Sequence, residues 1–338
     1  MTDAAQRVTI ADVARTAGVS VPTVSKVLNH RADVSSDTRE RVQQAISSHG
    51  YRRRTRSGRP RAALVDLVVA ELDSPYFLEV LTGAEQAAAR AGVGLVVTSA
   101  HGHEPRGGDW LATLTARRSS GIVMVVSVFD SSTLARLADL ATPLVLLDPV
   151  GGSDPTLPTV GATNWSGGLA ATEHLLSLGH RRVAVITGPP ELVCSQERLE
   201  GYRAAMGRAG IAVDDDLVRF GDFQPDGGQR AAAELLALPD PPTAIFAGSD
   251  MQASGVYQEA RAHGLRVPED LSVVGFDDLR ISRHLSPPLT TVRQPLAQMA
   301  AEAVRMTLEA SRHGFTSPPP RLELATSLTV RDSTAALH

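Results

Sequence analysis

The sequence has one cysteine, Cys194, among its 338 residues. A single thiol cannot form a disulfide within the chain, so the fold must be held together by packing and hydrogen bonds. We therefore expect a reducing compartment. We interpret Cys194 as a small side chain in a core or a pocket.

Long apolar segments are also absent. No stretch of the sequence approaches the roughly eighteen apolar residues that a membrane-spanning helix needs. The first residues do not show the basic segment and apolar run of a secretion signal. These two absences predict a cytoplasmic protein without a membrane partner.

Catalytic motifs are missing as well. The sequence contains no Gly-x-Ser-x-Gly nucleophile turn, no Gly-x-x-x-x-Gly-Lys phosphate loop and no His-Glu-x-x-His zinc motif. His101, His103, Glu104 and Asp109 lie in a glycine-rich stretch, where their irregular spacing favours an exposed loop over a metal site. The sequence therefore predicts a protein that is not an enzyme and that holds no metal or cofactor.

The charges that the sequence does contain are divided unevenly. Residues 1–61 hold twelve Lys or Arg against five Asp or Glu, which is a net charge of +7. Because the whole chain has a formal net charge of -4, the remaining residues carry -11. A basic N-terminal segment on an acidic body indicates a protein that binds a polyanion through that segment. Scattered charge on a solvated surface would not be separated to this extent.

The N-terminal segment begins with two short helical patterns. Apolar residues recur at helical spacing from Ile10 to Ala17, behind the capping hydroxyl of Thr9, and Gly18 then breaks the helix. Ser20 can cap a second helix that has an apolar inner face. That inner face consists of Val24, Val27 and Leu28, and the outer face consists of Val21, Pro22, Ser25 and Lys26.

A third helical pattern follows the first two. Either Ser35 or Ser36 can cap it, apolar residues continue to Ile46, and Gly50 ends it. Two helices around a glycine turn, braced by a third, form the helix-turn-helix that places one helix in a DNA groove. Helical hairpins of solenoid proteins also use glycine turns, but solenoids repeat and this pair occurs once. The outer face of the second helix is therefore expected to face DNA.

The segment from Val8 to Asn29 closely resembles the head of the lactose-repressor (LacI/GalR) family of transcription regulators. The residues that carry this resemblance are Val8, Thr9, Ile10, Asp12, Val13, Ala14, Ala17, Gly18, Val19, Ser20, Thr23, Val24, Ser25, Val27, Leu28 and Asn29. The resemblance implies a sequence-specific regulator that binds double-stranded operator DNA. Together with the outer face of the second helix, it gives the expected DNA contacts Thr9, Ser20, Val21, Pro22, Thr23, Ser25, Lys26 and Asn29.

Residues 52–61 form a basic linker that departs from this family. Family members usually carry an Ala-Arg-x-x-Leu type hinge helix, whose leucine enters the minor groove and kinks the DNA. No apolar residue occurs between Tyr51 and Ala62, and Gly58 and Pro60 interrupt the stretch. Arginines drawn into a narrow minor groove can replace the leucine, and a flexible tether is the alternative. The expected contacts are Arg52, Arg53, Arg54 and Arg56.

From Leu64 onward, short apolar runs alternate with helical patterns. With 43% hydrophobic and 21% charged residues, the chain is globular and long enough for two or three domains. The alternation predicts parallel sheets covered by helices on both faces, in a layout that resembles the two-lobed periplasmic binding proteins. The expected divisions are a small all-α head on residues 1–51, the linker on 52–61, and a doubly wound α/β core on 62–338, with one lobe at about 62–158 plus 290–338 and the other at about 159–289. A closing strand is expected from Glu323 to Val330.

Polar and aromatic residues follow several of the predicted strands. Ligands of open parallel sheets bind beyond the carboxyl ends of the strands, so these positions are candidates for a binding site. An arginine, carboxylates and an aromatic face suit a sugar, whose hydroxyls both donate and accept and whose C–H face packs on a ring. The residues after strands are Asp148, Phe223, Ser249, Asp250, Asp277 and Asp278, and Arg198 lies near the start of a helix.

The family resemblance identifies several of these residues as effector contacts. Arg198 and Asp277 fall where the family has its effector-binding Arg and Asp, and Phe223 falls where it has the stacking aromatic. Tyr76 and Phe77 match first-lobe contacts, and Ser249 stands where many members have Asn. The expected effector site is therefore Tyr76, Phe77, Asp148, Arg198, Phe223, Ser249, Asp250 and Asp277. The alternatives are helix caps for Asp250 and Asp278, core positions for Tyr76 and Phe77, and a surface charge for Arg198.

The sequence as a whole predicts a homodimeric repressor that binds a pseudo-palindromic operator and leaves it when a small molecule closes the cleft. A sugar or oligosaccharide is the expected effector, because the cleft residues lack the cationic cluster that suits a phosphate. A solute-binding receptor shares the core fold, but it needs export and no DNA-binding head. A metabolic enzyme on an open α/β sheet is the other alternative.

Overall fold

The computed structural model describes residues 10–28, 35–48, 62–69, 72–99, 110–125, 140, 142–148 and 157–337. The chain divides into two compact units, Met1–Pro60 and Arg61–His338, which we call the head and the core and describe separately. In the described part of the chain, no helix has both the length and the apolar character of a membrane span. The residues of interest that lie outside the described part are Thr9, Asn29, Arg52, Arg53, Arg54, Arg56, His101, His103, Glu104 and Asp109.

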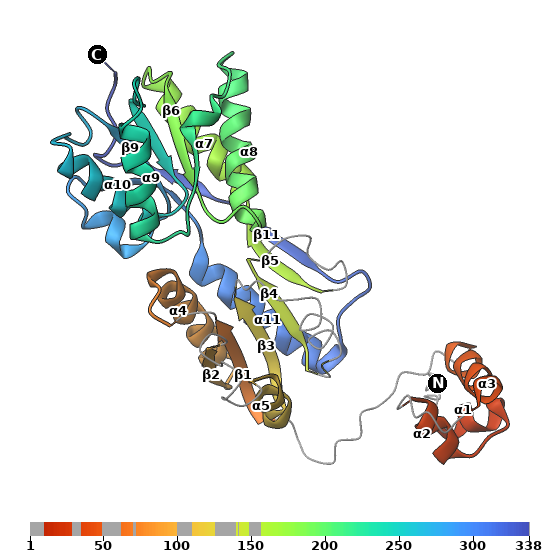
Figure 1. Ribbon diagram of the computed structural model, residues 1–338. Coiled ribbons are helices and arrows are strands. Elements are labelled where there is room, and N and C mark those ends of the chain that lie inside the picture. Colours follow the sequence, from red (N-terminus) through yellow and green to blue (C-terminus); the bar gives the residue numbers. More distant parts are fainter. Residues whose placement is uncertain are drawn as a thin grey trace, which may run out of the picture. The chain divides into compact units, whose positions relative to one another are not determined.

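In its described residues, 10–28 and 35–48, the head consists of three helices, as the sequence predicts (Figure 1). One valine from each helix is fully buried in a shared apolar cluster. Gly18 has a φ of 63°, which glycine adopts without strain, and the Ser20 hydroxyl accepts a hydrogen bond from the Thr23 N–H at 3.3 Å. The glycine turn and the cap therefore fix where the second helix starts. The helices are α1 (Ile10–Ala17), α2 (Val21–Leu28) and α3 (Ser36–Ser48).

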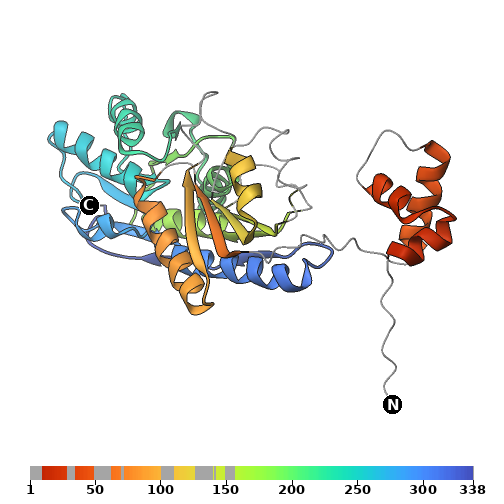
Figure 2. The ribbon, with the colours of Figure 1, turned by 90° about the horizontal axis from the view of Figure 1, so that it is seen from below.

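The first lobe of the core is built on a sheet with the strand order β11-β5-β4-β3-β1-β2, in which neighbouring strands are parallel. Helices α4 and α11 cover one face and α5 covers the other (Figure 2). Successive residues of β1 alternate between these faces, because Leu67 packs with α4 and α11 whereas Val68 packs with α5. The bounds are β1 (Ala62–Val69), α4 (Pro75–Arg90), β2 (Gly94–Ser99), α5 (Trp110–Arg117), β3 (Ser119–Val125), β4 (Leu144–Leu147), β5 (Thr159–Ala162), α11 (Leu296–His313) and β11 (Arg321–Leu324).

The second lobe repeats this plan with the strand order β12-β10-β9-β8-β6-β7. All described pairs are parallel except β10 with β12. Helices α7 and α8 pack on one face, and α9 and α10 pack on the other. The bounds are α7 (Asn164–Ser177), β6 (Val183–Thr187), α8 (Val193–Arg208), η1 (Asp215–Leu217), β7 (Val218–Phe220), α9 (Pro225–Leu236), β8 (Ala244–Ala247), α10 (Asp250–Ala262), β9 (Ser272–Asp277), η2 (Arg280–Arg283), β10 (Thr290–Arg293) and β12 (Ser327–Thr329).

Within the described core, the chain passes between the lobes after β5, after β10 and after β11. The first and the last of these crossings lie side by side, because the Thr326 N–H donates to Thr163 Oγ1 at 2.9 Å and the Thr326 hydroxyl donates to the Thr163 carbonyl at 3.1 Å. The Thr163 N–H in turn donates to the Leu324 carbonyl at 3.0 Å. Hydrogen bonds therefore join two of the three connections between the lobes.

The fold class agrees with the prediction from the sequence, but the lobe boundaries do not. We expected the second lobe to span about 159–289, whereas β5 belongs to the first sheet and β10 belongs to the second. The single closing strand expected from Glu323 to Val330 is in fact two strands, β11 in the first sheet and β12 in the second. A strand of three or four residues beside a crossing has the same apolar pattern in either sheet, so the pattern does not show which sheet it joins.

Candidate functional site

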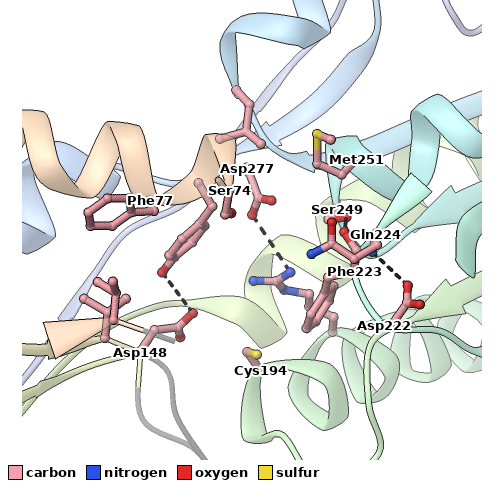
Figure 3. Close-up of a pocket in the computed structure, with 15 residues that line it drawn as sticks. Ser74, Phe77, Asp148, Cys194, Asp222, Phe223, Gln224, Ser249, Met251 and Asp277 are labelled. Carbon is pink, nitrogen blue, oxygen red and sulfur yellow. Dashed lines mark hydrogen bonds and ion pairs between the residues drawn. The ribbon is translucent and has the colours of Figure 1, made fainter. Parts of the chain in front are cut away.

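A cavity of about 280 Å³ lies between the two lobes, beyond the carboxyl ends of strands from both sheets (Figure 3). Figure 3 shows Phe77 and Asp148 on the side of the first lobe, and Phe223, Gln224 and Ser249 on the side of the second. The position agrees with the rule that ligands of open α/β sheets bind at the carboxyl edge. The predicted effector residues that line the cavity are Tyr76, Phe77, Asp148, Arg198, Phe223, Ser249 and Asp277.

Arg198 on α8 supplies a buried positive charge to this cavity, with 3% of its surface exposed. Its Nε donates to Asn164 Oδ1 at 2.9 Å, and its Nη1 donates to the Gly248 carbonyl at 2.5 Å. Its Cζ lies 3.8 Å from the centroid of the Phe276 ring and 5.3 Å from that of Phe223. The alternative of a surface charge is therefore wrong. An arginine held at a fixed position in this way is preorganised for ligand oxygens.

Asp277 faces Arg198 from the end of β9. Its Oδ1 lies 4.0 Å from Arg198 Nη1 and accepts a hydrogen bond from Gln294 Nε2 at 2.6 Å. Burial raises the pKa of Asp277 to about 7, although Arg198 and the bond from Gln294 act in the opposite direction. Near neutral pH this carboxyl group is therefore divided between its protonated and ionised forms.

The first lobe contributes a second carboxyl group, that of Asp148, directly after β4. The Tyr76 hydroxyl, from the first turn of α4, donates to Asp148 Oδ2 at 3.3 Å. Burial raises the pKa of Asp148, while Arg198 and the hydrogen bond from Tyr76 lower it. Phe77 lines the cavity next to Tyr76 and also packs in the apolar cluster under α4. Phe77 therefore both lines the cavity and is a core residue, and its contact with an effector stays a prediction.

Phe223 and Ser249 form part of the wall on the second lobe. Phe223 has a φ of 63°, and its carbonyl accepts a hydrogen bond from the Ser249 hydroxyl at 3.0 Å. The same Ser249 oxygen accepts from the Gln252 N–H at 3.0 Å and so caps α10. The Ser249 hydroxyl therefore both donates and accepts within the lobe, and the ring of Phe223 lines the cavity beside it.

Asp250 requires a correction, because it does not line the cavity. It is fully buried in the first turn of α10. Its Oδ2 accepts from the Leu279 N–H at 2.7 Å, and its Oδ1 accepts from the Thr291 hydroxyl at 2.5 Å. Both oxygens hold the second lobe together instead of facing a ligand. A position after a strand indicates the edge of a sheet, but it does not show which side chains turn toward the cavity.

Several lining residues were not predicted as site residues from the sequence. Val69 and Val125 end β1 and β3, so the strand-end rule could have found them. Met251 and Leu279 carry no such signal, because their side chains enter the cavity from the start of α10 and from the loop after β9. Cys194 also lines the cavity, as one of its expected roles, and burial raises the pKa of its thiol to about 12.

A second candidate surface lies on the head, on the outer face of α2. Val21 has 39% of its surface exposed, although it is apolar, and Pro22 and Lys26 are also exposed. Thr23 is half-buried and Ser20 caps the helix, so these two residues position α2 more than they extend from it. An exposed, mostly apolar face beside a lysine can contact base edges in a major groove.

Comparisons with known proteins identify the family. Residues 9–54 match the family model described as bacterial regulatory proteins, lacI family, and residues 172–334 match a periplasmic binding protein-like domain. The HTH-type transcriptional regulator CelR of Thermobifida fusca is 36% identical over 341 residues, covering 97% of this chain and 98% of that protein. The HTH-type transcriptional regulator DegA of Bacillus subtilis is 32% identical over 337 residues, covering 98% and 99%.

This chain belongs to the lacI family of bacterial regulatory proteins. A solved complex of the transcriptional regulator CelR with cellobiose has a TM-score of 0.73 and 36% identity, and covers 97% of this chain and 100% of that one. A lac repressor dimer bound to operator and the anti-inducer ONPF has a TM-score of 0.73 and 28% identity, and covers 98% and 100%. This lacI-family member is a DNA-binding transcriptional regulator with a helix-turn-helix head and a periplasmic-binding-protein-like core.

Proposed function

We propose that this regulator is a repressor that binds a pseudo-palindromic operator as a homodimer and leaves it when a neutral sugar or oligosaccharide occupies the cavity. The observation that carries the proposal is the buried Arg198, which lies near two carboxyl groups and the ring of Phe223. The solved complex of CelR with cellobiose supports a sugar as the ligand, since CelR resembles this chain over almost its whole length.

The chemistry of the cavity favours a neutral polyol. Asp148 and Asp277 can accept hydrogen bonds from ligand hydroxyls, Arg198 can donate to them, and the Phe223 ring can stack on the C–H face of a sugar. One cation beside two carboxyl groups disfavours a phosphate, which needs a net positive site. The volume of about 280 Å³ lies at the small end of ligand pockets, which favours a mono- or disaccharide.

The proposed operator contacts lie on the head and in the linker. Lys26 would donate to guanine O6 or N7, while Val21 and Pro22 would pack on a thymine methyl or exclude another base. Ser20, Thr23 and Ser25, with Thr9 and Asn29, would complete the contacts of the head. The four linker arginines, Arg52, Arg53, Arg54 and Arg56, would neutralise phosphates or enter the minor groove.

Exposed apolar side chains of the first lobe support a homodimer. Leu72 lies just before α4, Leu78 lies on α4, and Val97 lies on the neighbouring edge strand β2; they are 53%, 55% and 38% exposed. Exposed apolar patches on soluble proteins mark interaction surfaces. We expect Leu78→Glu to yield monomers in sedimentation velocity, while the same change at the exposed Val330 in the second lobe leaves a dimer.

The test of the proposed function is a thermal-shift screen of the full-length protein with cellobiose, glucose, ribose and glucose 6-phosphate. A bound ligand at 100 times its Kd adds about 2.7 kcal/mol to the free energy of unfolding. We expect at least one neutral sugar to stabilise the protein and the phosphate ester to have no effect. The stabilising sugar should then release the protein from an operator selected out of a random DNA library, measured by fluorescence anisotropy.

Two outcomes would contradict this function. Stabilisation by the phosphate ester alone would mean that the cavity selects an anion. A protein that selects no operator, although its head is folded, would be a sugar receptor without regulatory DNA binding.

A further inference from the structure

One short segment of the second lobe crosses the cleft and packs inside the first lobe. Leu279 follows β9, yet only 1% of its surface is exposed, and it belongs to the apolar cluster of the first lobe together with Val69 and Phe77. Met251 and Ile281, also from the second lobe, pack against the same cluster. Figure 3 shows Met251 on the second lobe opposite the helix that carries Phe77.

The backbone of this segment is nevertheless fixed to the second lobe. The Leu279 N–H donates to Asp250 Oδ2 at 2.7 Å, and Asp250 Oδ1 accepts from the hydroxyl of Thr291 on β10. Asp250 is fully buried on α10. Leu279 therefore has its main chain in one lobe and its side chain in the other.

Asp277 and Asp278, which precede Leu279, have an unusual conformation that links its position to the cavity. Their φ values are 112° and 57°, which are unfavourable for residues with a side chain. Hydrogen bonds hold both residues, from Gln294 Nε2 to Asp277 and from Arg331 Nη2 to Asp278. The carboxyl group of Asp277 and the side chain of Leu279 are thus joined by a turn that has little freedom to move.

A second connection between the lobes lies next to the first. Arg280 Nε, one residue after Leu279, is 3.0 Å from Oε1 of Glu79 on α4. The Arg280 side chain is 83% exposed and that of Glu79 is 27% exposed. This ion pair can therefore be altered without disturbing the apolar core.

We propose that Leu279 is a positioning residue for effector binding: by anchoring in the first lobe, it sets Asp277 and Arg198 of the second lobe against Asp148 of the first and makes closure of the lobes a condition of tight binding. The inference rests on the proposed effector function and adds how the arrangement of the lobes controls effector affinity. An effector that contacts both Asp277 and Asp148 favours the lobe arrangement in which Leu279 is buried, and release of Leu279 lets Asp277 move away from Asp148. Asp250, which contacts no effector, holds the anchor in place.

The sole cysteine provides a test that needs no ligand. Cys194 lines the cavity and is buried, so the rate at which a maleimide labels it reports how often the lobes separate. In the full-length protein, Leu279→Ala should speed labelling about tenfold, because a buried leucine holds the lobes together. Leu279→Met, which keeps the apolar volume, should label at nearly the wild-type rate. An unchanged rate in Leu279→Ala, with only a lower melting temperature, would overturn the proposal.

Charge reversal gives a second test that cannot fail through misfolding of the core. Glu79→Arg and Arg280→Glu should each speed labelling roughly two- to fivefold, since each places like charges together where the exposed Arg280 meets the half-buried Glu79. The double variant restores opposite charges and should return the rate to that of the wild type. Equal rates in all four proteins would show that this contact does not hold the lobes.

Effector titrations separate this inference from the proposed function. With a neutral sugar that stabilises the wild type, Leu279→Ala should weaken binding about tenfold or more, and Leu279→Met should bind normally. Normal affinity in Leu279→Ala would overturn the positioning role while leaving the sugar as effector. If no sugar binds the wild type, the proposed function fails, and the labelling rates still decide whether Leu279 joins the lobes.

Discussion

The head and the core cavity differ in how far the residues of their candidate binding surfaces are exposed to solvent. On the head, Val21, Pro22 and Lys26 stand in solvent on a helix that a small apolar cluster supports. In the cavity, Arg198 and Asp277 are buried, with 3% and 6% of their surfaces exposed. Exposed groups act independently and are screened by salt, whereas buried groups shift each other's pKa. The two surfaces should therefore respond to different changes, and four predictions test this contrast.

The largest effect is expected from Arg198→Ala. This change removes the buried cation and leaves Asp277 and the Asn164 amide without their partner, so effector affinity should fall by at least about 100-fold. Operator affinity should stay within about twofold, since the head is a separate unit. Calorimetry and DNA anisotropy measure the two quantities. Phe223→Ala should act in the same direction, and a normal effector response in both variants would mean that the effector binds elsewhere.

The next largest effect is the converse, a loss of operator affinity without a change in effector affinity. Lys26→Ala should weaken operator binding by about 1–3 kcal/mol and affect random DNA much less. Lys26→Arg is the matched control: it keeps the charge, so binding to random DNA should be unchanged, while the base preference shifts. An equal loss on operator and random DNA in Lys26→Ala would make this residue a phosphate contact. Effector affinity should not change in either variant.

A pH titration should distinguish the surfaces further. Sugar hydroxyls donate to an ionised carboxylate, so binding lowers the pKa of Asp277 from about 7 and releases a proton. Effector affinity should therefore rise with pH up to about 7 and then level off, with a slope of at most about tenfold per pH unit below 7. Asp277→Asn should flatten this dependence, and any slope that remains reports Asp148. A wild-type affinity that does not vary between pH 5.5 and 8 would contradict the predicted proton release.

The smallest effect is expected at the hydrogen bond between Tyr76 and Asp148. Tyr76→Phe removes a donor at 3.3 Å from a buried carboxyl group, which should lower effector affinity by about 1 kcal/mol. Tyr257→Phe is a matched control, because its hydroxyl donates to the Pro287 carbonyl at 3.0 Å outside the cavity lining. The control should lower the melting temperature without changing affinity. Equal affinities in both variants would remove Tyr76 from the set of recognition residues.

The head could be predicted almost completely from the sequence. Its helices follow from apolar spacing, the glycine turn and the serine caps, all of which act within a few residues. Most strands and helices of the core were predictable for the same reason, but β5 and β10 were not predicted as strands and β11 and β12 were predicted as one. The sheet that each short strand joins was not predictable, because β5 and β10 are placed by partners far away in the sequence.

The cavity was predictable only in part. Arg198, Phe223 and Asp277 were found because strand ends and a family motif agree on them, and all three line the cavity. The direction of Asp250 was not predictable, because its oxygens accept from Leu279 N–H and the Thr291 hydroxyl, two partners that are distant in the sequence. Leu279 was missed because its burial is produced by the opposite lobe, a contact that no local pattern encodes.

The hydrogen bonds between Thr163 and Thr326 determine what kind of motion the core allows. In the described core they join two of the three interlobe connections at one place, so these segments cannot slide past one another without losing these bonds and the one between Thr163 and Leu324. Rotation about that place needs only small changes in a few backbone angles. Thr163 and Thr326 thus act as a hinge between the lobes. A small rotation at this hinge produces a displacement that increases with distance from it and is largest at the far ends of the lobes.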